Sequence, residues 1–195
     1  MAAKAVRCGG TAIIGTETFY AIAANPFIDE AVKKVFSIKN RSFENPLPLI
    51  AANRKFVNSR VRVLPHIATI LIENFWPGSL TILLNTDEDF SKLVQNVSGK
   101  IGVRVPPQCP ARQLAEEVGG WITATSANLS GDSAPKSIMD IPPEIIHSVD
   151  VVVDSGPCSG GLPSTVVDIS KNGFKIVRIG AVSEKSLLKS LEHGD

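Results

Sequence analysis

The sequence is poor in residues that build covalent or metal cross-links. Its 195 residues include three cysteines, and these are scattered at Cys8, Cys109 and Cys158 with no Cys-x-x-Cys pair. The three histidines are widely separated and follow no ligand spacing. An odd set of isolated thiols argues against a disulfide framework and a zinc site, and it indicates a reducing compartment. We expect no metal site built by the protein itself.

A strong charge bias and long apolar runs are also lacking. The chain has 20 Lys and Arg against 19 Asp and Glu, a net charge of +1, so it is not a polycation of the nucleic-acid-binding type. Its longest strongly apolar run, 67–72, is far below the ~20 residues of a membrane span. Residues 1–10 contain no hydrophobic signal core. We therefore expect a cytoplasmic protein with no membrane partner.

Three common catalytic signatures are missing. The sequence contains no Gly-x-x-x-x-Gly-Lys-Ser/Thr phosphate loop, no Gly-x-Gly-x-x-Gly fingerprint and no Gly-x-Ser-x-Gly elbow. The usual nucleotide loops and the α/β-hydrolase nucleophile are thus excluded, and no Cys–His pairing is indicated.

The composition is that of an ordinary globular protein, with 44% hydrophobic and 20% charged residues. We expect one domain over 1–195, since this length suffices for a sizeable core. Short β-rich runs alternate with helical stretches, a pattern typical of α/β folds. The predicted strands are 11–14, 47–50, 80–84, 101–105, 122–124, 151–153, 165–169 and 175–179. The predicted helices are 29–38, 64–75, 111–118 and one from 183.

Two polar clusters stand where predicted elements end. Lys39 and Arg41 close the helix 29–38, and Asn45 follows in an extended loop. Ser126 and Asn128 follow the strand 122–124, before Ser130-Gly131. Cations at a helix end and a Ser-x-Asn turn are both routine by themselves. Taken together they supply charges and neutral donors for phosphate oxygens, and such groups gather at strand ends in α/β proteins.

Two further features suit an amino-acid ligand. The run Thr16-Glu17-Thr18-Phe19-Tyr20 follows the first predicted strand with three hydroxyls and one carboxylate. Glu17 could attract an ammonium group or lie beside a cation. Arg104 ends an apolar strand and needs a partner, which could be an internal carboxylate or the carboxylate of a ligand. The sequence leaves both alternatives open.

These residues occur in an order that resembles the YrdC-like threonylcarbamoyl-AMP synthases. The resemblance extends from about residue 10 to 180. The matching motifs are Thr-Glu-Thr-Phe-Tyr, Ile38-Lys39-Asn40-Arg41, Asn45-Pro46-Leu47, Trp76-Pro77-Gly78, Gly102-Val103-Arg104-Val105-Pro106, Thr-Ser-Ala-Asn-Leu-Ser-Gly from Thr125, Pro163-Ser164-Thr165-Val166-Val167-Asp168 and Arg178-x-Gly180.

The resemblance implies a twisted, largely open mixed α/β sheet with flanking helices and a large concave cavity. It implies that the chain joins L-threonine, bicarbonate and ATP into threonylcarbamoyl-AMP and pyrophosphate, for tRNA modification by a downstream transferase complex. Mg²⁺ would accompany ATP. The implied ATP-binding residues are Lys39, Arg41, Asn45, Ser126, Asn128 and Arg178, with Lys39 and Arg41 also catalytic. The implied threonine-binding residues are Thr18, Arg104 and Ser164.

The chain departs from the family pattern at a few positions, and two alternative functions stay open. Gly15 stands in place of Pro, Ser42 in place of Pro, Ile50 in place of His, and Ala21-Ile22-Ala23 in place of Gly-Leu-Gly. One alternative is a diverged nucleotide-binding paralogue with another substrate. The other is a non-catalytic module that binds tRNA or double-stranded RNA through the same cations.

Overall fold

The computed structural model describes residues 1–61, 63–86, 89–170 and 173–192. Its strands form two mixed sheets, both containing parallel and antiparallel pairs. The helices are α1 (Ala2–Arg7), α2 (Asp29–Ile38), α3 (Arg54–Arg60), α4 (His66–Phe75), α5 (Pro110–Val118), α6 (Pro143–Ser148) and α7 (Glu184–Glu192). Short 3-10 turns occupy Lys92–Val94 and Ile138–Asp140.

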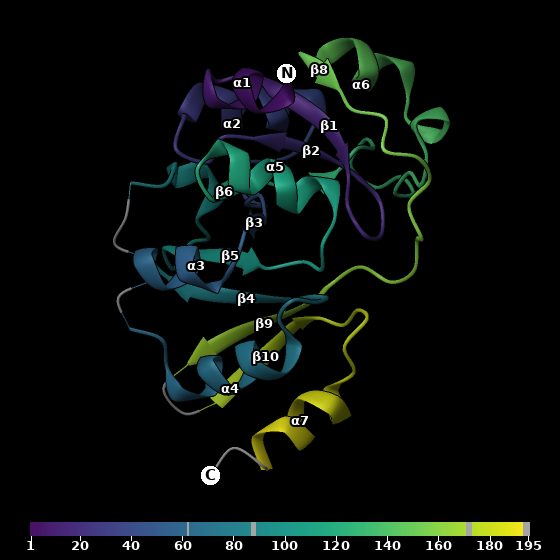
Figure 1. Cartoon of the computed structure of the whole chain (residues 1–195). Helices are drawn as coiled ribbons and strands as arrows, with labels where there is room; N and C mark the ends of the chain where they lie inside the picture. The colour runs from purple at the N-terminus through teal and green to yellow at the C-terminus, as the bar shows by residue number, and fades with distance from the viewer. Residues whose placement is uncertain (62, 87–88, 171–172, 193–195) are drawn as a thin grey trace.

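The four-stranded sheet has the order β7-β2-β1-β8. Its strands are β1 (Thr11–Gly15), β2 (Tyr20–Ala24), β7 (Thr125–Ser126) and β8 (Val151–Val152). The six-stranded sheet has the order β10-β9-β4-β5-β3-β6. Its strands are β3 (Leu49–Ala51), β4 (Leu80–Asn85), β5 (Lys100–Arg104), β6 (Trp121–Thr123), β9 (Thr165–Ser170) and β10 (Gly173–Arg178). In Figure 1 the four-stranded sheet lies near the N-terminus and the six-stranded sheet lies below it.

One extended segment links the two sheets. β6 pairs with β3 in the six-stranded sheet, and after Ala124 the chain continues as β7, which pairs with β2 in the four-stranded sheet. The hydroxyl of Thr123 accepts a hydrogen bond from the backbone N–H of Ala24 at 2.9 Å, across the same boundary. Polar side chains just after β6 are therefore held where the sheets meet.

The cores follow from the apolar faces of the helices. In α2, Ala31, Val32, Val35 and Phe36 are buried on one face, as the helical spacing predicts. α1 and α5 pack together and, with β1, bury a second apolar cluster that is rich in alanine and includes Leu114 (Figure 1). α4 and α7 pack on each other, and α7 lies below the six-stranded sheet in the view of Figure 1.

The predicted mixed α/β fold is confirmed, and all eight predicted strands and four predicted helices are present, with ends shifted by a few residues. The sequence did not predict β2, β7, α1, α3 or α6. The predicted single sheet is divided into two. No helix in the part of the chain that the structure describes combines the length and apolar character of a membrane span.

Candidate functional site

The first polar cluster is a helix C-cap. Asn40 has a φ of 47° and is the one described non-glycine residue in the left-handed region. The N–H of Arg41 donates to the carbonyl of Phe36 at 3.0 Å, and the N–H of Asn40 donates to that of Ser37 at 3.2 Å. This is the Schellman arrangement, and asparagine is among the few residues that tolerate its left-handed position. The chain reverses there, so Arg41 leaves the helix axis.

Arg41 then fixes the extended loop that follows. Its Nε donates to the carbonyl of Asn45 at 2.7 Å, and its Nη2 donates to that of Pro46 at 3.3 Å. The guanidinium and the loop therefore form one wall, and the loop continues directly into β3.

The second cluster is joined to the first through Lys39. Its Nζ donates to the carbonyl of Ser126, to the carbonyl of Asn128 at 2.5 Å and to Asn128 Oδ1 at 3.4 Å. In return, the hydroxyl of Ser130 donates to the carbonyl of Lys39 at 3.2 Å. Residues 39–41 and 126–130, remote in sequence, are thus side by side. Burial, with a smaller contribution from the neighbouring charge of Arg41, lowers the pKa of Lys39 to about 8, against a weak opposing effect of Asp132.

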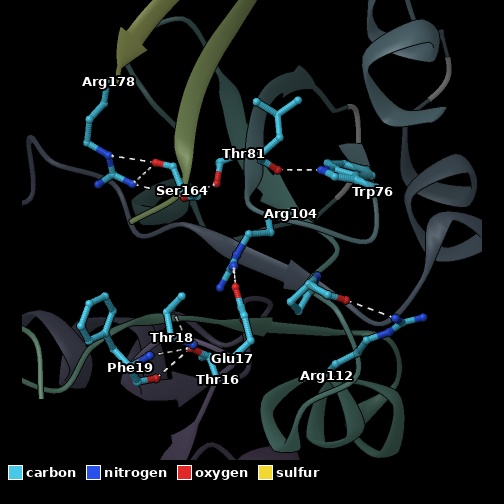
Figure 2. A network of polar contacts seen from close by, with 12 residues as sticks. Thr16, Glu17, Thr18, Phe19, Trp76, Thr81, Arg104, Arg112, Ser164 and Arg178 are labelled. Carbon is cyan, nitrogen blue, oxygen red and sulfur yellow. Dashed lines mark hydrogen bonds and ion pairs between the residues drawn. The ribbon is translucent and has the colours of Figure 1, made fainter. Parts of the chain in front are cut away.

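The turn between β1 and β2 is organised by one hydroxyl. Thr16 Oγ1 donates to the carbonyl of Phe19 at 2.8 Å and accepts from the N–H groups of Thr18 and Phe19 at 3.2 and 3.1 Å. Side chains of this kind replace backbone turn hydrogen bonds. The turn directs Glu17 toward the six-stranded sheet, where its Oε1 accepts from Arg104 Nη1 (Figure 2). The internal-carboxylate alternative for Arg104 is therefore present in the structure.

The face of the six-stranded sheet supplies the other wall. Thr81 on β4 and Ser164 before β9 share a hydroxyl hydrogen bond of 2.8 Å. Arg178 Nη2 donates to the carbonyl of Ser164 at 2.8 Å and to its hydroxyl at 3.2 Å (Figure 2). A β-bulge at Val177 shifts the register, since Ile176 pairs with Val167 while Arg178 pairs with Val166. Bulges redirect side chains in this way, and consecutive residues Val177 and Arg178 both reach the cavity.

Because Gly180 has no side chain, the end of β10 can approach the backbone of residues 163–165 closely. A Cβ at Gly180 would collide with the carbonyl oxygen of Pro163 and with the backbone of Ser164 and Thr165. The N–H of Ala181 donates to that carbonyl of Pro163 at 2.9 Å. Any larger residue at 180 would push Arg178 and Ser164 apart.

Together these elements enclose a cavity of about 530 Å³. Arg41, Asn45, Ser126 and Arg178 of the predicted ATP set line it, as do Arg104 and Ser164 of the predicted threonine set. Lys39, Asn128 and Thr18 are not among the lining residues. Lys39 is 2% exposed and Asn128 6%, because their polar atoms hold the loop 126–132 from behind.

The cavity is cationic. Burial and the neighbouring Arg178 lower the pKa of the Arg41 guanidinium, and burial and the neighbouring Arg104 lower the pKa of Arg178. Arg178 therefore lies close enough to both Arg41 and Arg104 for their positive charges to repel. None of the described lining residues is Asp or Glu. A bound polyanion would relieve this repulsion.

The sequence did not single out Thr81, Lys100 or Asn96, which also line the cavity. Lys100 Nζ forms an ion pair with Asp168 Oδ1 at 2.5 Å. The period of two along a strand places Lys100 and Gly102 on the face that carries Arg104. Once Arg104 is assigned to the site, this alternation indicates Lys100 as a further lining residue.

The structure shows the surroundings of two departures from the family pattern, Gly15 and Ile50. A Cβ at Gly15 would collide with the hydroxyl of Ser155, so the loop after β8 occupies the space that a side chain at 15 would need. Ile50 lines the cavity as a buried apolar wall, 1% exposed.

The residues available to a metal ion are few. Within residues 1–61, 63–86, 89–170 and 173–192, no three His, Cys, Asp or Glu side chains are grouped as a metal site requires. All three cysteines are free thiols. His193 lies outside the described residues.

Comparison with known proteins gives one family. The Sua5/YciO/YrdC family model, described as telomere recombination, matches residues 4–180. A protein of Methanocaldococcus jannaschii, provisionally named as a threonylcarbamoyl-AMP synthase, is 32% identical over 95% of this chain and 87% of its own length. The threonylcarbamoyl-AMP synthase of Pyrococcus abyssi is 30% identical over 97% of this chain. The chain spans only 56% of that relative.

The fold comparison agrees. The crystal structure of P. abyssi Sua5 complexed with L-threonine superposes with a TM-score of 0.90 at 29% identity, covering 97% of this chain and 56% of that one. The complex with threonine is a property of the P. abyssi protein, and it shows that a protein containing this fold binds an amino acid.

Proposed function

Because the chain belongs to the Sua5/YciO/YrdC family, we propose that it is a threonylcarbamoyl-AMP synthase, an enzyme that makes threonylcarbamoyl-AMP and pyrophosphate from L-threonine, bicarbonate and ATP. The observation that carries the proposal is the cavity between the sheets, where Arg41, Arg104 and Arg178 converge with hydroxyl donors. Three guanidinium groups suit one triphosphate and one carboxylate.

We assign the ATP side of the cavity to Arg41, Asn45, Ser126 and Arg178. Arg41 and Arg178 would neutralise the triphosphate, and Ser126 would donate to it from the end of β7. Lys39 and Asn128 complete this set from behind the wall, where Lys39 holds the backbone of 126–128 and adds its charge below the loop. Since the described lining residues include no carboxylate, Mg²⁺ would be held by the phosphate oxygens and water.

We assign the threonine side to Arg104, Ser164 and Thr18. Arg104 would bind the amino-acid carboxylate, and the hydroxyls of Ser164 and Thr18 would contact the remaining polar groups. The threonine amine captures CO₂ derived from bicarbonate, and the resulting carbamate oxygen attacks the α-phosphorus with release of pyrophosphate. The chain contributes positioning and charge neutralisation, and the step needs no side-chain nucleophile.

The wider setting is part of the same proposal. We propose that the chain acts as one domain, which is supported by a core cluster containing Ile13 and Ile22 of the four-stranded sheet and Ile82 and Val103 of the six-stranded sheet. Its product would serve threonylcarbamoyladenosine formation on tRNA through a separate transferase complex. The free thiols favour a reducing, cytoplasmic compartment.

The proposal is tested with purified protein supplied with L-threonine, bicarbonate and ATP. Pyrophosphate release should require all three, and threonylcarbamoyl-AMP should be detected by mass spectrometry. Arg41→Ala should reduce turnover at least about tenfold, whereas Arg7→Ala on α1, remote from the cavity lining, is the matched control. Pyrophosphate release without threonine, or none, would contradict the assignment.

The same protein separates the two alternatives. A rise in melting temperature with ATP and another amino acid, but not with threonine, would favour the diverged paralogue. Steeply salt-dependent RNA binding with no effect of ATP on melting would favour the RNA module.

A further inference from the structure

An ion pair beside the cavity joins the two sheets. Arg104 ends β5 in the six-stranded sheet, and Glu17 lies in the turn that follows β1 in the four-stranded sheet. Their side chains point toward each other in Figure 2 and are 13% and 18% exposed. Arg104 lines the cavity and Glu17 does not, so a ligand in the cavity meets the guanidinium first and reaches Glu17 only by entering between the two side chains.

The carboxylate of this pair is incompletely satisfied. Glu17 Oε1 accepts from Arg104, but Oε2 is buried and accepts no hydrogen bond from the described part of the chain. Burying a carboxylate oxygen that accepts no hydrogen bond costs free energy, and such atoms are uncommon in native structures. The pair thus has a guanidinium that faces the cavity and a carboxylate that lacks one donor.

We propose that the Glu17–Arg104 pair is a selectivity element for the zwitterion of an α-amino acid. The substrate enters between the two side chains. Its carboxylate binds the guanidinium of Arg104, and its ammonium donates the hydrogen bond that Glu17 Oε2 lacks. This inference rests on the proposed function, because it takes an amino acid as a ligand of that cavity. It identifies the carboxylate and the ammonium as the groups that the two side chains recognise.

Charge alternation explains the selectivity. A zwitterion brings one negative and one positive charge, so Arg104 and Glu17 exchange each other for a ligand group and all four charged groups have a partner of opposite sign in the complex. A carboxylate without an amine must compete with Glu17 for Arg104 and leaves Glu17 unpaired in a half-buried position. An amine without a carboxylate leaves Arg104 unpaired. Both should be rejected, since breaking one partner from a buried pair is costly.

The experiment is a calorimetric titration with three probes: L-threonine, 3-hydroxybutyrate, which lacks the amine, and 1-amino-2-propanol, which lacks the carboxylate. The wild-type chain should bind threonine at least about tenfold more tightly than either analogue. Glu17→Gln should weaken threonine binding by roughly tenfold and strengthen 3-hydroxybutyrate binding, because Arg104 is released. A gain for the amine-free acid is a result that a purely structural role of Glu17 would not produce.

Asp168→Asn is the matched control, because it removes the carboxylate that pairs with Lys100, another cation of the cavity lining, and leaves the Glu17–Arg104 pair intact. The same gain in Asp168→Asn would indicate a general field effect and overturn the proposal. Equal binding of threonine and 3-hydroxybutyrate by the wild-type chain would also overturn it, and this result needs no variant to fold.

Failure here is distinguishable from failure of the proposed function. A chain that makes threonylcarbamoyl-AMP but does not discriminate against 3-hydroxybutyrate refutes only the selectivity element. A chain that discriminates in this way for another amino acid, without threonine activity, refutes only the proposed reaction.

Discussion

The link between the two polar clusters can be tested most directly at Lys39, because the ammonium group of this residue donates the hydrogen bonds that join them. Lys39→Met keeps the length of an unbranched side chain and removes the charge. The carbonyls of Ser126 and Asn128 then lose a buried donor, at about 1 to 3 kcal/mol each. Against this, the variant no longer desolvates an ammonium group. At pH 7 the two effects oppose each other, so the single-pH loss of stability should be modest.

The pH dependence separates the two effects. Burial lowers the pKa of Lys39 from 10.5 to about 8, so between these values the unfolded chain binds a proton that the folded chain does not. The free energy of unfolding of the wild type therefore rises with pH across this window relative to Lys39→Met. The full rise is about 3 kcal/mol, from roughly 1.4 kcal/mol for each pH unit.

Urea unfolding at pH 7, 8, 9 and 10 measures this difference, with the fluorescence of the buried Trp76 and Trp121 as the signal. Lys33→Met, on the exposed side of the same helix, controls for the loss of one positive charge. A difference between wild type and Lys39→Met that stays flat or falls above pH 8 would refute the burial argument.

Three further substitutions test the local geometry. Gly180→Ala should lower the melting temperature and raise the KM for threonine, since its Cβ would displace Pro163; unchanged kinetics would contradict the close contact. Asn40→Val should cost about 1 to 2 kcal/mol in urea unfolding while Asn40→Gly is neutral, because the position is left-handed; equal stability of the two variants would refute this. Ser164→Ala removes a hydroxyl that we assign to threonine, so the KM for threonine should rise. Arg178 keeps its bond to the carbonyl at 164, so the KM for ATP should be nearly unchanged, as steady-state kinetics can check.

Much of the fold could be predicted from the sequence, because the strands of the six-stranded sheet are short apolar runs and the main helices carry regular apolar stripes. β2 was missed because Tyr20-Ala21-Ile22-Ala23-Ala24 is rich in alanine, which has a low strand propensity. Its strand conformation depends on pairing with β1 and β7, and tertiary pairing of this kind leaves little trace in the local sequence.

Motif order placed residue types near the cavity but could not tell which side chains face it. Lys39 and Asn128 belong to the same motifs as Arg41 and Ser126, yet the structure buries the first two behind the wall. The direction of a side chain beyond a helix end depends on the cap, here the left-handed Asn40, and on which backbone carbonyls lie opposite. Val177 could not be predicted for a similar reason, since a bulge breaks the period of two.

Three guanidinium groups from separate elements of the fold share one cavity. Arg41 follows the C-cap of α2, Arg178 ends a bulged edge strand and Arg104 ends β5, so each guanidinium is anchored by its own element. The carbonyls of Asn45 and Ser164 and the carboxylate of Glu17 hold them in place against mutual repulsion. Such anchoring leaves little to reorganise when a triphosphate binds, and the remaining repulsion among the guanidinium groups favours a ligand with several negative charges.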